Sequence, residues 1–161
     1  MNSAPLFEEK ICAPEALADR VRHLPSPIVF TNGVFDLLHR GHVTYLAQAR
    51  AQGASLVVAL NDDASVKRLG KGEDRPINTL EDRCAVIAAL ESVSLVTWFA
   101  QDTPLLLIQT ICPQVLVKGG DWPVEKIVGA DWVQQRGGRV LSIAFEHERS
   151  TTRMLEKIRK A

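Results

Sequence analysis

From residue 28 onward the chain alternates short β-branched runs with segments of helical periodicity, and this alternation limits its possible folds more than any other feature. The runs expected to form strands are residues 28–31, 55–60, 94–98, 115–118 and 139–144. In one intervening segment Leu80, Cys84 and Ile87 recur at the spacing of a single helix face. Strands that alternate with helices form a parallel sheet, because each crossover helix returns the chain to the same end of the sheet. We therefore expect an α/β fold.

The first 27 residues do not follow this alternation. Their prolines surround one short helical segment whose apolar face is Leu17, Val21 and Leu24. We interpret residues 1–27 as an appendage docked on the sheet and residues 28–161 as the main domain.

Two local signals refine the prediction between the strands. Thr103 and Pro104 have the residue types of an N-cap and a first helical position, so a helix is expected to begin there and to end before Pro113. Residues 67–79 are polar and contain two glycines, so we expect a mobile loop.

Composition excludes several classes of partner. The 161 residues carry 19 Lys and Arg against 19 Asp and Glu, so no net charge attracts nucleic acid or an anionic membrane. No run of about 18 apolar residues occurs, and residues 1–10 do not resemble a secretion signal. Cys12, Cys84 and Cys112 lack paired or metal-type spacing and have apolar neighbours, so we expect them to be buried thiols. A cytoplasmic location follows as an expectation.

Residues 31–42 leave the first expected strand and enter a helix. Gly33 and Gly41 allow the backbone to approach an anion closely, and the helix N-terminus offers unpaired N–H groups. His39 and His42 can direct two imidazoles toward one point, as donors to phosphate oxygens that gain charge in a transition state. A helix cap or a zinc site is the alternative, but zinc requires further ligands that are not grouped here.

The sequence Gly33-Val34-Phe35-Asp36 followed by His39-Arg40-Gly41-His42 resembles the GxFD and HxGH motifs of the cytidylyltransferase-like nucleotidyltransferases. The resemblance implies a Rossmann-like fold with five parallel strands in the order 3-2-1-4-5 and helices on both faces. It also implies that both histidines contact the α- and β-phosphates of the nucleotide and that Asp36 shapes the nucleotide pocket. Thr31, Asn32, Gly33, Phe35 and Gly41 are the further nucleotide-binding candidates of this segment.

Two later segments complete the expected nucleotide site. Ser150, Thr151 and Thr152 open the last helix and resemble the second triphosphate motif of the family, although helix capping alone is the alternative. The family commonly has an arginine five residues before the first hydroxyl, where this chain has Phe145, and Arg149 is a candidate to replace that charge.

The fourth expected strand ends in Lys118-Gly119-Gly120-Asp121. In the order 3-2-1-4-5 its carboxyl end lies beside that of the first strand, where open parallel sheets bind ligands. We therefore expect Lys118 to be catalytic and Gly119 and Asp121 to contact the nucleotide. The alternative is a surface lysine beside a glycine turn.

The remaining candidates rest on less. The resemblance implies that Arg83 reaches the phosphates, whereas a surface ion pair is the usual fate of such a residue. The acceptor-binding candidates are Asn61, Asp62, Lys67 and Arg75.

Within the family, several stretches resemble the bacterial heptose-1-phosphate adenylyltransferases: residues 31–36, 74–78, 102–104, 117–121 and 150–152. This resemblance implies transfer of the adenylyl group of ATP to a heptose 1-phosphate, which gives ADP-heptose for the inner core of lipopolysaccharide. It also implies Mg²⁺ bound with ATP, no metal site built by the protein, and a homodimer in which residues 1–27 are a candidate for part of the interface. The chain has no room for the sugar kinase that often precedes this domain, so we expect the stand-alone form.

The residues also suggest why no general base is prominent. A sugar 1-phosphate is already largely a dianion at neutral pH, so the expected reaction needs positioning and charge neutralisation rather than deprotonation. A cytidylyltransferase acting on glycerol 3-phosphate or phosphoethanolamine shares these motifs, and a non-catalytic nucleotide-binding regulatory module would use the same crevice. A dinucleotide-dependent oxidoreductase lacks support because no GxGxxG follows the first expected strand. An aminoacyl-tRNA synthetase lacks support because no basic surface is evident.

Overall fold

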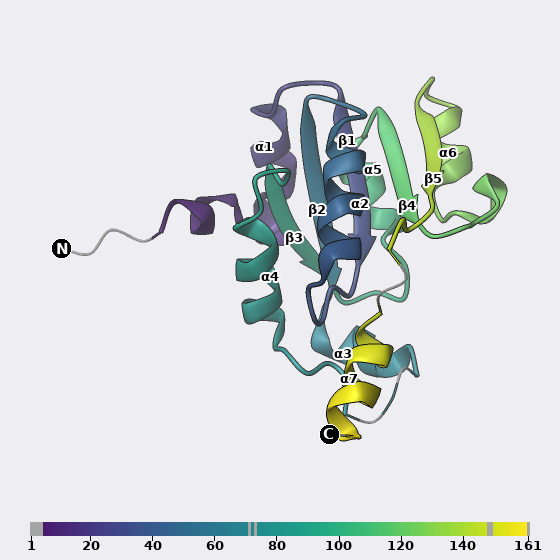
Figure 1. Ribbon diagram of the computed structural model, residues 1–161. Helices are drawn as coiled ribbons and strands as arrows, with labels where there is room; N and C mark the ends of the chain where they lie inside the picture. The colour runs from purple at the N-terminus through teal and green to yellow at the C-terminus, as the bar shows by residue number, and fades with distance from the viewer. Residues whose placement is uncertain (1–4, 71, 73, 148–149, 161) are drawn as a thin grey trace.

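The computed structural model describes residues 5–70, 72, 74–147 and 150–160. Its strands form one parallel sheet in the order β3-β2-β1-β4-β5, as expected (Figure 1). The strands are β1 (Ile28–Gly33), β2 (Ser55–Asn61), β3 (Leu95–Phe99), β4 (Val115–Gly119) and β5 (Arg139–Ile143). Each overlaps a run predicted from the sequence, with ends that differ by up to two residues.

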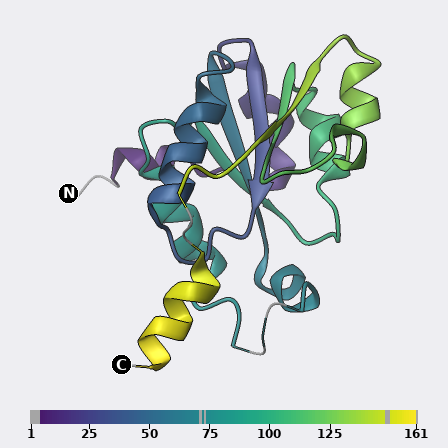
Figure 2. The same ribbon diagram turned by 45° about the vertical axis from the view of Figure 1, so that its right-hand side comes forward.

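Helices cover both faces of this sheet. The α-helices are α1 (Leu17–Arg22), α2 (Arg40–Arg50), α3 (Asp63–Arg68), α4 (Leu80–Ala88), α5 (Leu105–Ile111), α6 (Ala130–Gln134) and α7 (Thr151–Arg159). The short 3₁₀ helices are η1 (Leu6–Lys10), η2 (Pro14–Ala16) and η3 (Val124–Lys126). Figures 1 and 2 show α7 beyond the carboxyl ends of the strands, away from the body of the sheet.

The core divides into two layers because successive strand residues point to opposite faces. Phe30 of β1 belongs to a cluster that α1, α5 and α6 cover, and its neighbour Val29 belongs to a second cluster that α2 and α4 cover. Most strand residues are buried because helices lie on both sides, so the strands read as continuous apolar runs.

The N-terminal segment packs directly against this core. Leu17 and Val21 of α1 are buried in the first cluster, and Ile11 pairs with Val96 of the edge strand β3. The short helix expected within residues 1–27 is therefore present. The division of the chain at residue 27 stays a prediction.

Three local predictions need correction. The helix α5 begins at Leu105, so Pro104 rather than Thr103 occupies the N-cap position. Cys112 is exposed, because it ends α5 in a left-handed conformation (φ 50°) just before Pro113, whereas Cys12 and Cys84 are buried as expected. Lys67 lies within α3 and not in a loop, because Asp62 caps this helix by accepting a hydrogen bond from the backbone N–H of Ser65 at 2.7 Å.

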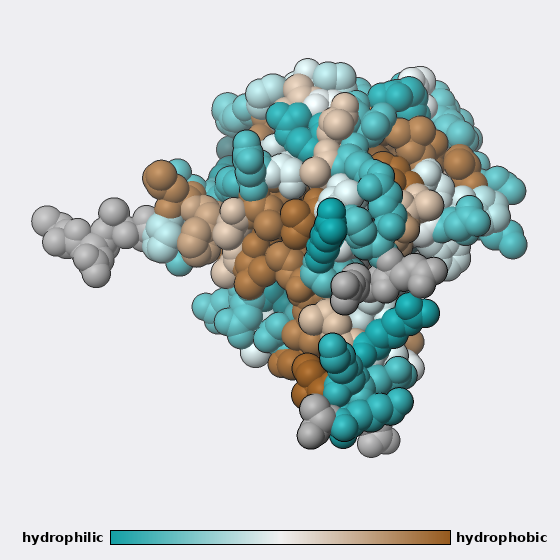
Figure 3. Space-filling model, in the orientation of Figure 1, coloured by the Kyte–Doolittle hydropathy of each residue, from teal (hydrophilic) through white to brown (hydrophobic). Residues whose placement is uncertain are grey.

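The surface seen in the orientation of Figure 1 is mostly hydrophilic (Figure 3). Hydrophobic residues gather between α2 and α4, the helices on which Val43 and Val86 are exposed. Among the described residues no helix is long and apolar enough to cross a bilayer.

Candidate active site

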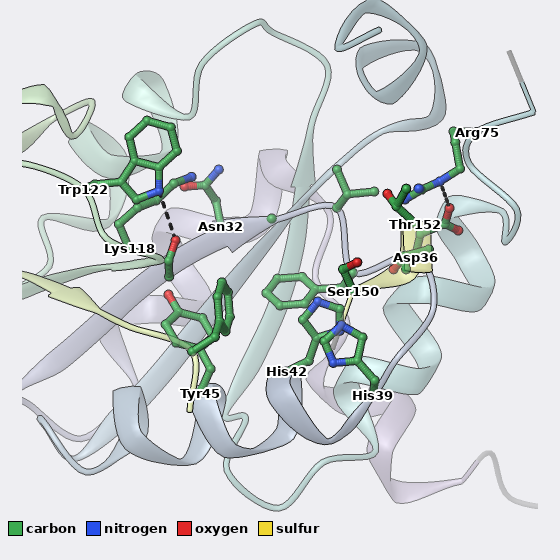
Figure 4. Close-up of a pocket in the computed structure, with 16 residues that line it drawn as sticks. Asn32, Asp36, His39, His42, Tyr45, Arg75, Lys118, Trp122, Ser150 and Thr152 are labelled. Atoms are coloured by element: carbon green, nitrogen blue, oxygen red, sulfur yellow. Dashed lines mark hydrogen bonds and ion pairs between the residues drawn. The ribbon is translucent and has the colours of Figure 1, made fainter. Parts of the chain in front are cut away.

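A cavity of about 400 Å³ lies at the carboxyl ends of β1 and β4, between the N-termini of α2 and α7 (Figure 4). These strands are neighbours whose following helices cover opposite faces of the sheet, and ligands of open parallel sheets bind at such a point. The cavity is lined by Asn32, Gly33, Val34, Phe35, Asp36, His39, His42, Tyr45, Arg75, Lys118, Gly119, Trp122, Phe145, Ser150, Thr151 and Thr152. We call it the first cavity.

Both motif histidines line the first cavity at the start of α2. His39 is the N-cap residue and His42 lies in the first turn, and their rings stack with centroids 3.8 Å apart. The Phe35 and His42 rings lie at an angle of 72° to each other, with centroids 5.2 Å apart. Gly41 keeps room for the His39 ring, because a Cβ there would come within 3.1 Å of the ring and would require it to shift. The motif thus holds two imidazoles at the positive end of a helix dipole, where an anion is favoured.

Asp36 fastens the loop after β1 to the segment before α4. Its buried carboxylate accepts hydrogen bonds from the backbone N–H groups of Ile77 and Asn78 at 2.9–3.0 Å and from Arg75 Nε at 2.5 Å. Burial alone would raise the pKa of Asp36, but the two backbone donors and Arg75 together hold it below its ordinary value. Asp36 is therefore an ionised anchor that shapes the cavity wall.

Phe35 adopts a left-handed backbone conformation, with φ at 47°. This conformation is uncommon for a residue with a bulky side chain and carries a cost of about 1–3 kcal/mol. The hydrogen bonds of the neighbouring Asp36 hold the loop in this conformation. Phe35, the residue with the strained backbone, lines the first cavity.

The second helix N-terminus comes from α7. Ser150 caps the helix by accepting a hydrogen bond from the Arg153 N–H at 3.2 Å, and the Thr151 hydroxyl donates to the Leu37 carbonyl at 3.4 Å. Thr152 is exposed and lines the cavity. Capping therefore explains Ser150, while the turn as a whole directs three hydroxyl residues and backbone N–H groups toward the same space as the histidines.

Lys118, at the end of β4, stands on the other side of the first cavity (Figure 4). Gly119 follows it so closely packed that a Cβ would come within 2.7 Å of the Phe145 ring. Trp122 folds back over this turn and donates from Nε1 to the Gly119 carbonyl at 3.2 Å. The loop predicted to carry a phosphate ligand thus faces the loop of β1 across the crevice.

Aromatic side chains form the end of the first cavity near Lys118. The rings of Tyr45 and Phe145 meet edge to face with centroids 5.4 Å apart. Tyr45 Oη and Thr31 Oγ1 share a hydrogen bond of 2.5 Å, and burial raises the pKa of Tyr45 well above its ordinary value. Thr31 is itself fully buried and supports Tyr45 rather than lining the cavity.

Sequence reasoning missed Tyr45 and Trp122 as lining residues and treated Phe145 only as a departure from the family. Tyr45 follows His42 by three residues on α2, so helical spacing places both on one face. That spacing is the signal that could have found it. No comparable signal marks Trp122, whose position depends on the turn at Gly120 (φ 111°).

A second cavity, of about 410 Å³, adjoins the first. Both are lined by Asn32, Gly33, Val34, Lys118 and Trp122, which we call the shared wall. The residues that line only the second cavity are Asn61, Leu69, Phe99, Asp102, Thr103, Pro104, Lys126, Ile127 and Val128. Of the acceptor-binding candidates only Asn61 lies there.

Arg75 lines the first cavity, on the side of the expected triphosphate, where it pairs with Asp36. This position in the first cavity does not support the prediction that Arg75 binds the acceptor. Asp62 is the cap of α3, and Lys67 lies on the same helix. Neither lines the first or the second cavity, and the same is true of Gly41 and Asp121.

Arg83 does not line a cavity either. It is 1% exposed and donates to the carbonyls of Val34 at 2.8 Å and Asn61 at 2.9 Å, and to the Asp63 carboxylate at 2.7 Å. It also donates to the Asn78 carbonyl at 3.1 Å. The guanidinium thus joins the ends of β1 and β2, so the structure gives Arg83 a positioning role and no place on the wall of the first cavity. Arg149 lies outside the described residues.

No group of three His, Cys, Asp or Glu side chains suited to a metal ion occurs among the residues that the structure describes. The stacked histidines therefore have no third such ligand in the described part of the chain. Of the lining residues that the structure describes, Asp36 is the one carboxylate in the first cavity, and Arg75 and two backbone N–H groups already donate hydrogen bonds to it.

The geometry agrees with the similarity to known proteins. Residues 30–155 match the family model described as cytidylyltransferase-like. The D-beta-D-heptose 1-phosphate adenylyltransferase of Bordetella bronchiseptica is 52% identical over 160 residues, which are 98% of this chain and 99% of that protein. The bifunctional protein HldE of Azotobacter vinelandii is 58% identical over 133 residues, and the match spans 28% of that longer protein.

Solved structures show the same architecture. The lipopolysaccharide core biosynthesis protein from Thermoplasma volcanium superposes with a TM-score of 0.60 at 26% identity, covering 76% of this chain and 98% of that one. A pantoate-beta-alanine ligase from Francisella tularensis superposes with a TM-score of 0.59 at 12% identity over 88% of this chain and 68% of that one, which indicates a common fold alone.

Proposed function

The chain belongs to the cytidylyltransferase-like family and is a nucleotidyltransferase, and on this premise we propose that it transfers the adenylyl group of ATP to D-glycero-β-D-manno-heptose 1-phosphate. The products are ADP-heptose, a precursor of the lipopolysaccharide inner core, and pyrophosphate. The choice of acceptor is supported by the Bordetella relative, which is named for a heptose 1-phosphate and matches over nearly its whole length.

One observation carries the proposed chemistry. Two helix N-termini, with His39 and His42 on one and Ser150 to Thr152 on the other, meet at the first cavity opposite Lys118. Three sources of positive potential around one space fit a triphosphate, and the aromatic end at Tyr45 offers apolar surface for a base.

The reaction needs little beyond this arrangement. A phosphate oxygen of the acceptor forms a bond to the α-phosphorus of ATP while the bond from that phosphorus to the bridging oxygen of pyrophosphate breaks. No proton moves from the nucleophile, since the acceptor phosphate is largely a dianion at neutral pH. His39, His42 and Lys118 stabilise the charge that spreads over the transferring group, and the helix N-termini hold the leaving pyrophosphate.

Mg²⁺ is part of the proposal. Among the described residues that line the first cavity, Asp36 is the one carboxylate, and it already accepts hydrogen bonds from Arg75 and two backbone N–H groups. These residues fit an ion that enters with ATP and is coordinated by phosphate oxygens and water, which is how Mg²⁺ commonly binds nucleotides. The ion would neutralise phosphate charge during transfer.

The test offers the purified protein ATP or CTP with heptose 1-phosphate, glycerol 3-phosphate or phosphoethanolamine, and measures pyrophosphate release and the product mass. We expect release with ATP and heptose 1-phosphate alone, ADP-heptose as product, and loss of release when EDTA removes Mg²⁺. Release with CTP and glycerol 3-phosphate but not with heptose 1-phosphate would overturn the substrate. ATP binding without turnover in any combination would favour the regulatory module.

A cytoplasmic location and a homodimer complete the proposal. ATP and phosphorylated sugars are cytoplasmic metabolites, and the family resemblance supports two copies of the chain. Light scattering on the full chain measures the assembly, and a mass near that of one chain, 17.8 kDa, would exclude the dimer.

A further inference from the structure

We propose that Asp102, held in place by Arg68, binds hydroxyl groups of the acceptor sugar in the second cavity. Asp102 lies in the connection between β3 and α5, and Arg68 is the last residue of α3. The inference rests on the proposed function, because it concerns the acceptor of that reaction.

The shared wall fixes how an acceptor must lie. Its phosphate has to reach the α-phosphorus of a nucleotide in the first cavity, so it must lie near Lys118, which faces both cavities. The rest of the acceptor then extends among the residues that line only the second cavity. Those residues therefore contact the hydroxyl groups of a phosphorylated sugar.

The charged side chains of the second cavity set the orientation of a bound sugar phosphate. Lys118 stands on the shared wall, and among the described residues the charged side chains that line only the second cavity are those of Asp102 and Lys126. The Asp102 carboxylate repels a phosphate but accepts hydrogen bonds from hydroxyl groups, and such charge-assisted bonds are the stronger kind. A sugar phosphate thus fits with its anionic end at Lys118 and its neutral hydroxyl groups at Asp102.

Arg68 positions this carboxylate. Its Nε donates to Asp102 Oδ1 at 3.0 Å, and its Nη2 donates to the carbonyl of Ala100. One planar guanidinium therefore holds both the side chain and the backbone of the β3–α5 connection, while Arg68 itself lines neither cavity. Within the described residues, Asp102 Oδ2 accepts no hydrogen bond and the Asp102 side chain is 84% exposed, so this oxygen can accept a hydrogen bond from a sugar hydroxyl.

Trp122 supplies an apolar surface beside these polar groups. It is 51% exposed, lies on the shared wall, and is fixed by its hydrogen bond to the Gly119 carbonyl. Phe99 and Ile127 add buried apolar surface to the same cavity. Sites for polar small molecules combine such surfaces with a few placed hydrogen-bonding groups, and Asp102 is one of these groups here.

The test compares Asp102→Asn with the wild type and with Asp131→Asn, a matched change of charge at an exposed position on α6 that lines neither cavity. We expect Asp102→Asn to raise KM for heptose 1-phosphate about 10-fold or more, the typical effect of losing a hydrogen bond to a charged group. The KM for ATP and kcat should change little, because the lost hydrogen bond stabilises the bound acceptor equally in the ground state and in the transition state. Asp131→Asn should behave as wild type.

The sign of the effect separates hydrogen bonding from simple charge. Removing a carboxylate near an anionic ligand would tighten binding if only Coulomb forces acted. We therefore also measure Kd by calorimetry, with a non-hydrolysable ATP analogue present, for heptose 1-phosphate and for inorganic phosphate. Weaker binding of the sugar phosphate with equal or tighter binding of phosphate supports the proposal. Equal or tighter binding of heptose 1-phosphate by Asp102→Asn overturns it.

Arg68 is tested through Asp102. Arg68→Ala should raise KM for heptose 1-phosphate by a similar factor, Arg68→Lys should recover part of it, and the double variant with Asp102→Asn should be no worse than either single variant. Additive losses would contradict the positioning role.

The wild type distinguishes a failure of the proposed function from a failure of this inference. No pyrophosphate from ATP and heptose 1-phosphate removes the proposed function, whereas wild-type turnover with unchanged Asp102→Asn kinetics removes only this inference.

Discussion

At the scale of single residues, His39 and His42 carry the largest catalytic expectation, because their stacked rings face the first cavity at a helix N-terminus. Replacing either with alanine removes one preorganised donor to the charge of the transition state. We predict that His39→Ala or His42→Ala lowers kcat by about 10²- to 10³-fold. The dissociation constant of ATP should change far less. Pyrophosphate release measures kcat, and calorimetry measures the dissociation constant. The exposed His23, on the far side of the sheet from α2, provides the control His23→Ala. Near-normal turnover of a variant would make that histidine structural.

Asp36 is a second residue with a definite expectation, since its pKa is lowered in the folded protein. Such a group stabilises the fold fully above its unfolded pKa of about 3.9, and this contribution is lost as the pH falls through the lower folded pKa. Asp36→Asn should cost about 1.5–3 kcal/mol at pH 7, because it removes the charge that its donors face.

This difference between wild type and Asp36→Asn should shrink as the pH falls below about 4 and the wild-type carboxylate gains its proton. Urea unfolding of both proteins at several pH values from neutral to acid measures it. A difference that stays constant over this range would contradict the ionised, hydrogen-bonded state of Asp36.

At the scale of elements, α7 allows helix capping and phosphate binding to be separated. Ser150 caps this helix and lines the first cavity. Ser150→Ala should lose about 1 kcal/mol of stability, whereas Ser150→Asp should keep the cap. The new carboxylate would face the triphosphate, so Ser150→Asp should weaken ATP binding at least 10-fold while thermal unfolding stays near that of the wild type.

Thr79 provides the matched control, because it caps α4 in the same way and lines neither cavity. Thr79→Ala should lose stability comparable to Ser150→Ala without any change in the dissociation constant of ATP. Wild-type ATP affinity in Ser150→Asp would show that Ser150 only caps α7.

The elements also show what the sequence could predict. The strands and the motif at the start of α2 were predictable, because apolar periodicity and the spacing of glycine and histidine are local signals. The order of the strands came from the family resemblance, since no local signal sets which strands are neighbours. The role of Arg83 was not predictable, since its acceptors Val34, Asn61 and Asn78 come from three separate segments. Arg75 was assigned to the acceptor for the same reason: no local pattern shows that it closes onto Asp36.

At the scale of the whole molecule, the N-terminal segment belongs to the packing of the sheet. Cys12 donates its backbone N–H to the Val96 carbonyl at 2.8 Å, and Lys10 Nζ donates to the Leu90 carbonyl at 3.1 Å. Leu17 is fully buried in the cluster that also contains Leu107 and Ile108 of α5. The segment therefore covers the edge strand β3 and one face of the sheet, although it lines neither cavity.

We accordingly predict that the N-terminal segment contributes to stability and not to catalysis. Leu17→Ala should cost about 2–5 kcal/mol, as large-to-small changes in a core do, with unchanged kcat and KM in the folded protein. Leu6→Ala, at a position 81% exposed, should cost little and serves as the control.

Deleting residues 1–27 should expose the apolar face of β3 and abolish cooperative thermal unfolding, because an uncovered edge strand and half-open core favour aggregation. Circular dichroism melting and light scattering measure both outcomes. A truncated chain that melts cooperatively near the wild-type temperature would show instead that residues 28–161 fold as an independent domain.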